Sequence, residues 1–479
     1  MTTRPLPTGT PAAQGVDARG VEDFLDALEA APGIEPHSLM IMRHGRLIAE
    51  GWWAPHTPDR KQLLYSLGKS LTSTAAGLAV ADGLLDLDAP VVSYFPEFDA
   101  EITDPGSRAI LVRHVASMAT GHLAETHVRA VALDPREIVR GFLLLPPDRT
   151  PGTVFAYNQP ATYSLGAIIQ RVTGKTLTEY LRPRLLDPLG IGEVAWTQRP
   201  AGRDLAFSGL HATTDAIARL GQLYLQGGRW QGRQLLPTSW VAEATRSQVA
   251  NSAGTPESAA SDWEQGYGFQ FWMSRHGYRG DGAYGQFCVV LPDHDAVIAT
   301  TAQTELMQDL LNLMWEHLLP AFGPEPLHDV RQADPALRER LAGLRIPPLA
   351  TVPDTSVDRD AWSGSTFTPE GGRCADQRTL TGATLTADAS GWTLSLAEGD
   401  STLDLRFGDD AWTVAESPVP TAVSAGWTDA GTLVASVRFL ETPHHLLLTF
   451  SLPDRTFTAH WPCVPMPRGP LRSYQAPRR

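Results

Sequence analysis

The chain has 479 residues, enough for two or three domains with cores of their own, and a net charge of −14 that argues against nucleic acid or an anionic membrane as a partner. Its 42% hydrophobic and 19% charged residues are typical of a soluble globular protein. No early segment combines a basic start with an apolar core, so we expect neither a secretory signal nor a transmembrane helix and predict a cytoplasmic protein.

The first elements are a helix and a pair of strands. Apolar residues recur at helical spacing over residues 16–31, and residues 38–48 are typical of two strands joined by a tight turn at His44-Gly45. An apolar segment rich in small residues then runs from Tyr65 to the pair Asp82-Gly83, which provides a helix stop. Because small residues let neighbouring elements approach closely, this pattern predicts a central, buried helix.

Residues from about 86 to 215 are rich in helical patterns and lack strand alternation. Helices are predicted at 138–145, 163–172 (with Gly174 as C-cap), 215–226 and 305–319, and strands at 267–272, 286–291 and 296–301. Strands from both ends of this region must join one sheet. We therefore predict an α+β fold, an antiparallel sheet flanked by helices with an inserted all-α lobe, and a ligand site between the lobes.

After Pro347-Pro348 the pattern changes to short strands. Runs of alternating residues at 392–396, 402–407, 433–439 and 446–450 are separated by turn residues and indicate an all-β barrel or sandwich. The predicted domains are therefore residues 1–345, with the helical lobe at about 86–215, and an all-β domain at 350–479.

The candidate chemistry lies at the start of the central helix. Helical spacing places Ser66 one turn from Lys69, and Lys61, Lys69 and Lys175 are the only lysines among 39 Lys and Arg residues. A desolvated lysine can lose its proton and act as a base, whereas arginine cannot. The alternative, a capping serine with a solvated lysine nearby, is common for so short a motif but fits a buried helix less well.

Further segments extend this pair into a family resemblance. The motif Ser66-x-x-Lys69, the segment Pro-Gly-Thr-x-Phe-x-Tyr157 and residues 113–121, 209–215 and 281–285 resemble the serine β-lactamase and penicillin-binding-protein superfamily. The resemblance covers roughly residues 10–320 and is strongest to the class C, esterase-like branch. It implies a β-lactamase-like fold in which Ser66 is the nucleophile, Lys69 the activating base and Tyr157 the base that relays a proton to the leaving group. It also implies an oxyanion hole formed by the N–H groups of Ser66 and of a residue at about Ala283.

Two positions depart from the family pattern. The family's Tyr-x-Asn becomes Tyr157-Asn158-Gln159, so we expect Gln159 to take the role of Asn. The third motif, Lys-Thr-Gly or His-x-Gly, aligns with Gly280-Asp281-Gly282 and has no basic side chain at its head, although His276 and Arg279 are near in sequence. An acidic group here favours neutral or amine-bearing substrates over carboxylates. The candidate oxyanion and substrate-binding residues are thus Ala283, Gly282, Asp281 and Gln159.

The sequence predicts a serine hydrolase that cleaves an ester or amide of a small molecule or peptide through an acyl-Ser66 intermediate. Two alternatives stay open: a D-amino-acid peptidase or an acyl transferase or peptide cyclase of the same fold, and an inactive ligand-binding or sensor protein. The aromatic residues of 263–272 are expected in the core, with some lining an acyl pocket. The all-β domain resembles the lipocalin-like C-terminal domains of some family members, but its role and the oligomeric state stay open.

No cofactor or metal is expected. The three cysteines lie far apart. The histidines of the helical region have no carboxylates at ligand spacing, so they are expected to be packed or exposed side chains: His114, His122, His127 and His211.

Overall fold

The computed structural model describes residues 5–327, 333–350, 352, 357–389, 391–408, 411–466 and 468–478. The chain divides into two compact units. The first comprises Met1–Gly51, Leu64–Ala342 and Pro477–Arg479, and the second comprises Trp52–Leu63 and Gly343–Ala476.

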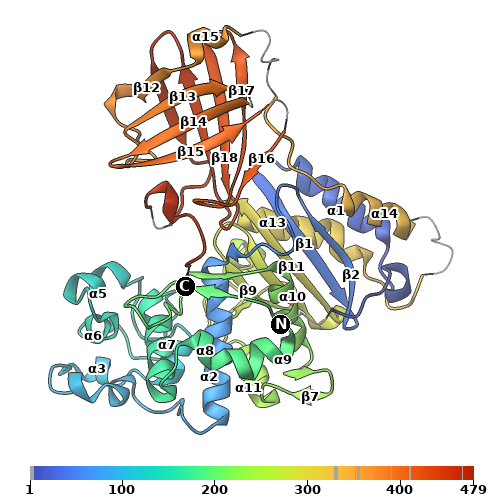
Figure 1. The fold of residues 1–479 in the computed structure, drawn as a ribbon. Coiled ribbons are helices and arrows are strands. Elements are labelled where there is room, and N and C mark those ends of the chain that lie inside the picture. Colours follow the sequence, from blue (N-terminus) through green and yellow to red (C-terminus); the bar gives the residue numbers. More distant parts are fainter. Residues whose placement is uncertain are drawn as a thin grey trace. The chain divides into compact units, whose positions relative to one another are not determined.

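An antiparallel sheet organises the first unit (Figure 1). In the described part of the chain it has six strands in the order β2-β1-β11-β10-β9-β8. The predicted tight turn is confirmed, because His44 and Gly45 have positive φ angles of 48° and 72° between β1 and β2. β1 pairs with β11 from the far end of the unit, as the sequence predicted. The strand bounds are β1 Ile34–Arg43, β2 Arg46–Trp52, β8 Trp272–Met273, β9 Tyr278–Gly282, β10 Gln286–Leu291 and β11 Ala296–Thr304.

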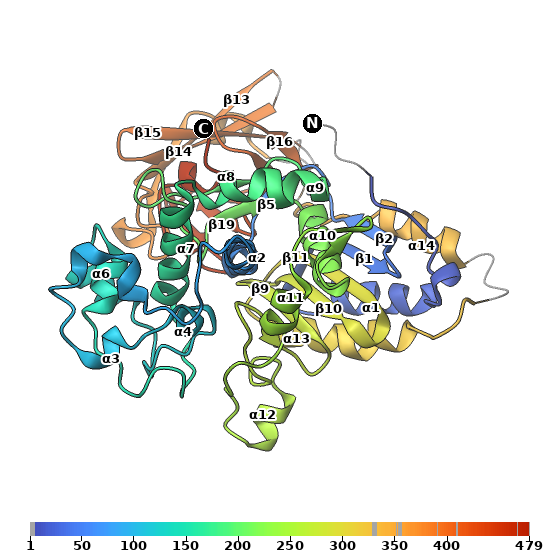
Figure 2. The same cartoon turned by 90° about the horizontal axis from the view of Figure 1, so that it is seen from below.

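Helices cover both faces of this sheet (Figure 2). On one face lie α1 (Ala18–Ala30) and α13 (Met307–Leu313), which continues as a π-helical turn over Met314–Leu318. On the other face, α10 (Thr214–Leu225) packs against β1, β10 and β11. Each helix buries the apolar stripe that its sequence predicted; α1, for example, buries Val21, Phe24, Leu25 and Leu28.

The central helix α2 spans Gly68–Ala81 and is buried from Gly68 to Ala79, as predicted. A 3₁₀ turn over Tyr65–Leu67 leads into it, and Asp82 followed by Gly83, with φ 70°, ends it. A Cβ atom on Gly77 would lie 2.5 Å from Trp240 of α11 (Thr238–Ala244), so a glycine is needed where the two helices meet. The small residues of α2 therefore act by permitting close packing.

The inserted lobe is helical, and Gly174 caps its longest helix in the left-handed conformation. The prediction that residues 86–215 lack strands is wrong in one place, because β4 (Ala195–Trp196) pairs with β5 (Leu210–Ala212). Strands this short show no alternation in sequence. The helices are α3 Pro105–Arg108, α4 Val112–Ala116, α5 His127–Leu133, α6 Ile138–Leu143, α7 Gln159–Thr173, α8 Leu177–Leu181 and α9 Asp187–Leu189, with a π-helical turn at Arg182–Leu186.

The strand predicted at 267–272 is also wrong, since only Trp272 enters a strand. Gln270 has a φ of 64°, and its buried side-chain amide donates to the Ala116 carbonyl at 2.7 Å and accepts from Thr162 at 2.7 Å. A polar side chain bonded across to the helical lobe thus bends an apolar run. The remaining elements of the unit are β6 Arg229–Trp230, β7 Arg233–Gln234, α12 Pro256–Ala260 and α14 Ala333–Ala342.

The second unit is a barrel-like sheet, as the sequence predicted. Among the described residues it has nine strands in the order β15-β14-β13-β12-β20-β19-β18-β17-β16, and β15 at one edge contacts β16 and β17 at the other. Its core contains Trp362, Trp392 and Trp427 in edge-to-face contact. The bounds are β12 Ser365–Pro369, β13 Gly382–Asp388, β14 Gly391–Glu398, β15 Ser401–Phe407, β16 Thr413–Ala415, β17 Thr421–Asp429, β18 Thr432–Phe439, β19 His445–Ser451 and β20 Thr456–His460, with α15 at Arg359–Trp362.

Residues 52–63 group with this second unit although they precede Ser66 in the chain. Ala54 exchanges backbone hydrogen bonds with Leu344 and Ile346, at 3.1 and 2.8 Å. The Leu63 N–H donates to the Glu441 carbonyl at 2.9 Å. Within the described residues, no helix has both the length and the apolar character needed to span a bilayer.

The close contact at Gly77 predicts a loss of stability in Gly77→Ala. The added methyl group would overpack the contact with Trp240, and overpacking of this kind typically costs about 1–3 kcal/mol of unfolding free energy. Urea unfolding followed by tryptophan fluorescence measures the change. Gly323→Ala is the matched control, because its Cβ would meet its nearest atom, the Gly15 carbonyl oxygen, at an ordinary 3.5 Å. A Gly77→Ala protein as stable as the control would contradict the packing described here.

Candidate active site

The structure brings Ser66 and Lys69 together. Ser66 lies in the 3₁₀ turn before α2, and Lys69 is the second residue of α2. Lys69 Nζ is 2.9 Å from Ser66 Oγ and donates to the Phe207 carbonyl at 2.8 Å. Ser66 is half-buried, whereas Lys69 is only 2% exposed. The hydroxyl is therefore reachable from solvent while the amine beside it is not.

Burial changes the charge state of the lysine. It lowers the pKa of Lys69 to about 7, although the negative charges of Glu125 and Asp281 act in the opposite direction. A substantial fraction of Lys69 is therefore uncharged at neutral pH and has a lone pair that can accept a proton.

The Phe207 carbonyl is a part of the site that sequence reasoning missed. Ala206 has a φ of 64°, and the Phe207 N–H closes a tight turn to the Leu205 carbonyl at 2.7 Å. This turn packs against α7, where a Cβ on Gly166 would lie 2.3 Å from Ala206 Cβ. A backbone acceptor of this kind leaves no residue-type signal in the sequence.

Tyr157 lies next to the Ser66 and Lys69 pair. Lys69 Nζ is 4.8 Å from the centre of the Tyr157 ring, and the Ser66 side chain is near enough to act on the pKa of the Tyr157 hydroxyl. Trp272 stacks on the ring at 5.2 Å with an interplanar angle of 19°. Burial, together with the charge of Asp281, raises the pKa of Tyr157 far above neutral. The hydroxyl therefore remains protonated at neutral pH and can pass a proton on without resting as an anion.

Aromatic side chains form one wall of the site. Tyr267 meets Tyr157 edge to face at 6.1 Å, and Phe155 contacts both Tyr267, at 5.2 Å, and Trp272, at 5.6 Å. Two of these rings, Tyr267 and Trp272, belong to the segment 267–272 that the sequence predicted to be a strand. They form an apolar surface beside the nucleophile.

The segment after Tyr157 is held by residues 125–127. Thr126 donates through its backbone N–H and its hydroxyl to Asn158 Oδ1, at 3.2 and 2.9 Å, and Asn158 is fully buried. The Gln159 N–H donates to Glu125 at 3.1 Å. Among the described residues, the buried side-chain oxygen of Gln159 has no hydrogen-bond partner. The residue expected to take the family Asn role thus keeps an acceptor available for a ligand.

The end of β9 lies against the turn that carries Ser66. A Cβ on Gly282 would be 2.0 Å from the Leu64 carbonyl oxygen, so only glycine allows this approach. Tyr65 and Tyr284, with φ of 48° and 70°, flank Ser66 and Ala283, and their rings meet edge to face at 5.1 Å. Neither the Ser66 nor the Ala283 N–H donates in the turn and loop hydrogen bonds of the described residues. These two N–H groups are the predicted oxyanion donors.

The head of the third motif cannot carry a basic side chain. A Cβ on Gly280 would lie 2.5 Å from Ser70 Oγ of α2. Arg279 instead is completely buried and pairs with Asp281 through Nε, at 3.1 Å, while its guanidinium lies 4.4 Å from the Trp263 ring. His276 packs on Trp315 at 5.0 Å. Burial raises the pKa of Asp281, although the charge and hydrogen bond of Arg279 act to lower it. The side chain that the sequence predicted to select a substrate is thus buried and paired inside the protein.

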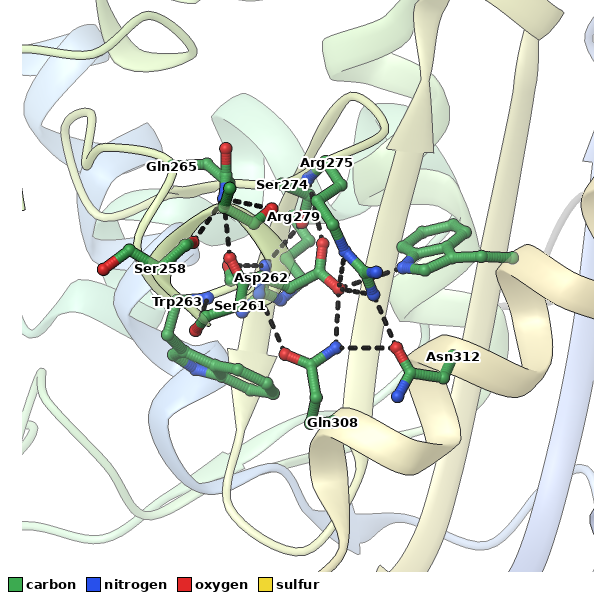
Figure 3. Close-up of polar contacts among 12 residues, drawn as sticks. Ser258, Ser261, Asp262, Trp263, Gln265, Ser274, Arg275, Arg279, Gln308 and Asn312 are labelled. Carbon is green, nitrogen blue, oxygen red and sulfur yellow. Dashed lines mark hydrogen bonds and ion pairs between the residues drawn. The ribbon is translucent and has the colours of Figure 1, made fainter. Parts of the chain in front are cut away.

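A polar network behind β9 holds Arg279 in place (Figure 3). Its Nη1 donates to the Asp262 backbone carbonyl at 2.7 Å. The buried Asp262 carboxylate accepts from Arg275 at 2.7 Å and from Gln308 at 2.7 Å. Burial alone would raise the pKa of Asp262, but hydrogen bonds from Arg275, Trp315 and Gln308 outweigh it and lower that pKa. The Asp262 side chain thus stays ionised and anchors the segment.

The histidines of the helical region have other contacts. The buried His122 ring bonds Thr120 and the Leu145 carbonyl, and His127 packs on Phe207 at 5.4 Å. In the described ranges, no group of three or more His, Cys, Asp or Glu side chains has an arrangement that could hold a metal ion.

Comparison with known proteins gives the family and the fold. The model of the Beta-lactamase family matches residues 21–318. The 6-aminohexanoate-dimer hydrolase of Paenarthrobacter ureafaciens is 28% identical over 279 residues, which cover 54% of this chain and 71% of that protein. The lovastatin esterase of Penicillium rubens is 30% identical over 168 residues, which cover 30% of this chain and 42% of the esterase. A solved structure, a putative 6-aminohexanoate-dimer hydrolase from Bacillus anthracis, has the same fold, with a TM-score of 0.53 and 19% identity over 68% of this chain and 89% of its own.

The contact of Gly280 with Ser70 predicts that Ser70→Ala will lower the stability cost of Gly280→Ala. Gly280→Ala should lower the unfolding free energy by about 1–3 kcal/mol, because its Cβ would meet Ser70 Oγ at 2.5 Å. In a Ser70→Ala background the same change should cost less, since the remaining Ser70 Cβ is 3.3 Å away. Urea unfolding of the four proteins measures both costs.

Gly282→Ala is the matched control for this cycle. Its Cβ meets a backbone carbonyl, so its cost should be the same with and without Ser70→Ala. Equal costs of Gly280→Ala in the two backgrounds would show that Ser70 does not exclude a side chain from the third motif.

Proposed function

This chain belongs to the Beta-lactamase family, and we propose that it is a serine hydrolase that cleaves an ester or amide bond through an acyl-Ser66 intermediate. The observation that carries the proposal is the 2.9 Å approach of Lys69 Nζ to Ser66 Oγ, with the pKa of the lysine lowered to about 7. A hydroxyl is a weak nucleophile until a positioned base takes its proton. Relatives named as an esterase and as a dimer hydrolase agree with this reaction class.

In the acylation step, uncharged Lys69 takes the proton of Ser66 as Oγ attacks the substrate carbonyl carbon. The N–H groups of Ser66 and Ala283 then stabilise the negative oxygen of the tetrahedral intermediate. Tyr157, which lies next to Ser66 and Lys69, donates its proton to the departing alcohol or amine and regains one from protonated Lys69. The products are the acyl-Ser66 ester and the free leaving group, with Lys69 uncharged again.

The acyl-enzyme is resolved by the same groups in reverse. Water attacks the acyl carbon, its proton passes through Tyr157 to Lys69, and Lys69 returns a proton to Ser66 Oγ. An amine in place of water would give acyl transfer, the second enzymatic candidate. A lysine with a lowered pKa next to a half-buried serine can supply this chemistry, and binding of a ligand alone does not require it. This distinction favours an enzyme over a sensor.

A fluorophosphonate probe should label Ser66. The activated hydroxyl displaces fluoride, and mass spectrometry of the digested protein should place the adduct on the peptide that contains Ser66. Ser66→Ala should lose both the label and the hydrolysis of p-nitrophenyl acetate. Ser93→Ala, which removes an exposed serine hydroxyl, should retain both. An unlabelled wild-type protein with no esterase activity above that of Ser66→Ala would rule out the proposed reaction.

Lys69→Arg should be nearly as damaging as Lys69→Ala, with losses of about 10²–10⁴-fold in kcat/KM, because arginine cannot give up its proton. The acylation rate of the wild type should rise with pH and level off above about 7, since the uncharged lysine is the reactive form and its pKa is lowered to about 7. Stopped-flow acylation by a p-nitrophenyl ester measures both effects. Lys175→Arg, at an exposed lysine, is the matched control and should retain wild-type rates.

Tyr157→Phe distinguishes the role of Tyr157 as a proton relay from the role of Lys69 as the base. It should lose activity in the same range, but its pH profile should keep the wild-type midpoint because Lys69 is the group that titrates. If Lys69→Arg kept most of the wild-type rate, Lys69 would act only as a fixed positive charge, and its role as a base would be contradicted.

A further inference from the structure

We propose that Glu125 is a specificity residue that selects substrates carrying a protonated amine, an inference that rests on the hydrolase activity proposed for Ser66. The sequence suggested a selecting negative charge at Asp281. In the structure Asp281 is buried and paired with Arg279, whereas Glu125 is exposed and accepts from the N–H of Gln159, two residues after Tyr157.

Contacts of residues 125–127 place this segment at the site. Glu125 accepts from the N–H of Gln159, two residues after Tyr157, and Thr126 donates to Asn158. The His127 ring packs at 5.4 Å on Phe207, the residue whose carbonyl binds Lys69. Three consecutive residues thus contact the two segments that surround the proposed base and relay, and the Glu125 carboxylate lies at the rim of the same site.

The carboxylate of Glu125 is not in an ion pair. In the part of the chain that the structure describes, no Lys, Arg or His side chain forms one with it, although Arg199 is close enough to act, as Glu125 does, on the pKa of His127. The Glu125 carboxylate accepts hydrogen bonds from the N–H groups of His127, at 2.8 Å, and Gln159. Burial lowers the pKa of His127, so this imidazole is uncharged at neutral pH and does not offset the carboxylate. Glu125 also acts electrostatically on both Lys69 and Tyr157, which agrees with its position by the reacting groups.

The carboxylate has capacity for one more donor. Its two oxygens offer about four lone-pair sites, and its hydrogen bonds to backbone N–H groups come from His127 and Gln159. A substrate ammonium can therefore bind without displacing a contact already made. A charge-assisted hydrogen bond that is shielded as the substrate binds typically changes affinity by roughly ten- to a hundredfold.

A purely structural role must be separated from this one, because Glu125 also accepts from the first N–H of α7. Glu125→Gln removes the charge but keeps a side-chain oxygen that can accept from Gln159 and His127. Asp148→Asn is the matched control: Asp148 is a carboxylate of the same lobe whose side chain likewise accepts a backbone N–H, that of Leu123, at 3.0 Å. The acidic residues that chiefly act on the pKa values of Lys69 and Tyr157 are Glu125 and Asp281, and Asp148 is not one of them.

The experiment measures kcat and KM for two series of alkyl esters. In one series the acyl chain ends in an amine, an N-acetyl amide or a carboxylate, and in the other the alcohol carries these groups. We expect the wild type to prefer the amine over the N-acetyl ester by about tenfold or more in kcat/KM in at least one series. Glu125→Gln should bring this ratio close to one, mainly through KM, and Asp148→Asn should leave the ratio and the rates unchanged. The preference should also shrink with added salt.

Three outcomes would overturn the role of Glu125. The first is a wild-type preference for the carboxylate or the N-acetyl ester in both series. The second is an amine preference that survives Glu125→Gln, and the third is an equal loss on all substrates in that variant, which would indicate capping of α7 alone. These outcomes differ from a failure of the proposed hydrolase itself. In that case Ser66→Ala would keep its turnover, or the wild type would show no turnover on any ester.

Discussion

A primary amine buried against a serine hydroxyl is the interaction on which the rest of this site depends. Removing a lysine from water disfavours its charged form. Among the described residues, the polar and aromatic contacts of Lys69 Nζ are Ser66 Oγ, the Phe207 carbonyl, and the rings of Tyr157 and Phe207. These contacts satisfy the amine without supplying a counter-ion at hydrogen-bonding distance. The lysine therefore sits near the midpoint of its titration at neutral pH, where it can both accept and return a proton.

Close backbone approach is the second constraint, and glycines provide it. Gly282 lets β9 reach the turn before α2, and Gly166 lets α7 receive the turn that presents the Phe207 carbonyl. At Gly280 the close approach of β9 and α2 also limits substrate recognition. Ser70 occupies the space that a basic side chain at the head of the third motif would need. The packing that positions the nucleophile thus also removes the usual cation from the substrate site.

The charges around the site follow from this packing. The side chain of Arg279 is buried, and it contacts Asp281, the Trp263 ring and the Asp262 carbonyl. Asp281 is buried and paired with Arg279, although its charge still acts on Lys69 and Tyr157. The carboxylate of Glu125 is exposed to solvent, where a charged group of a substrate can reach it. For this reason we assign the selection of substrate charge to the exposed Glu125 and not to the buried residue of the third motif.

The sequence alone determined the sheet of the first unit, its central buried helix, the barrel-like second unit and the family. Each of these depends on periodic apolar patterns or on residue types in a fixed order, which a linear chain displays. It also singled out Ser66 and Lys69, because a helix fixes the distance between residues three apart. Only the tertiary structure decided that the Phe207 carbonyl binds the lysine and that the chain turns at Gln270 within the strand predicted at 267–272. It also decided that Arg279 pairs with Asp281 and that Glu125 binds the Gln159 N–H. These facts depend on backbone direction and on contacts between residues far apart in the chain, which no local pattern encodes.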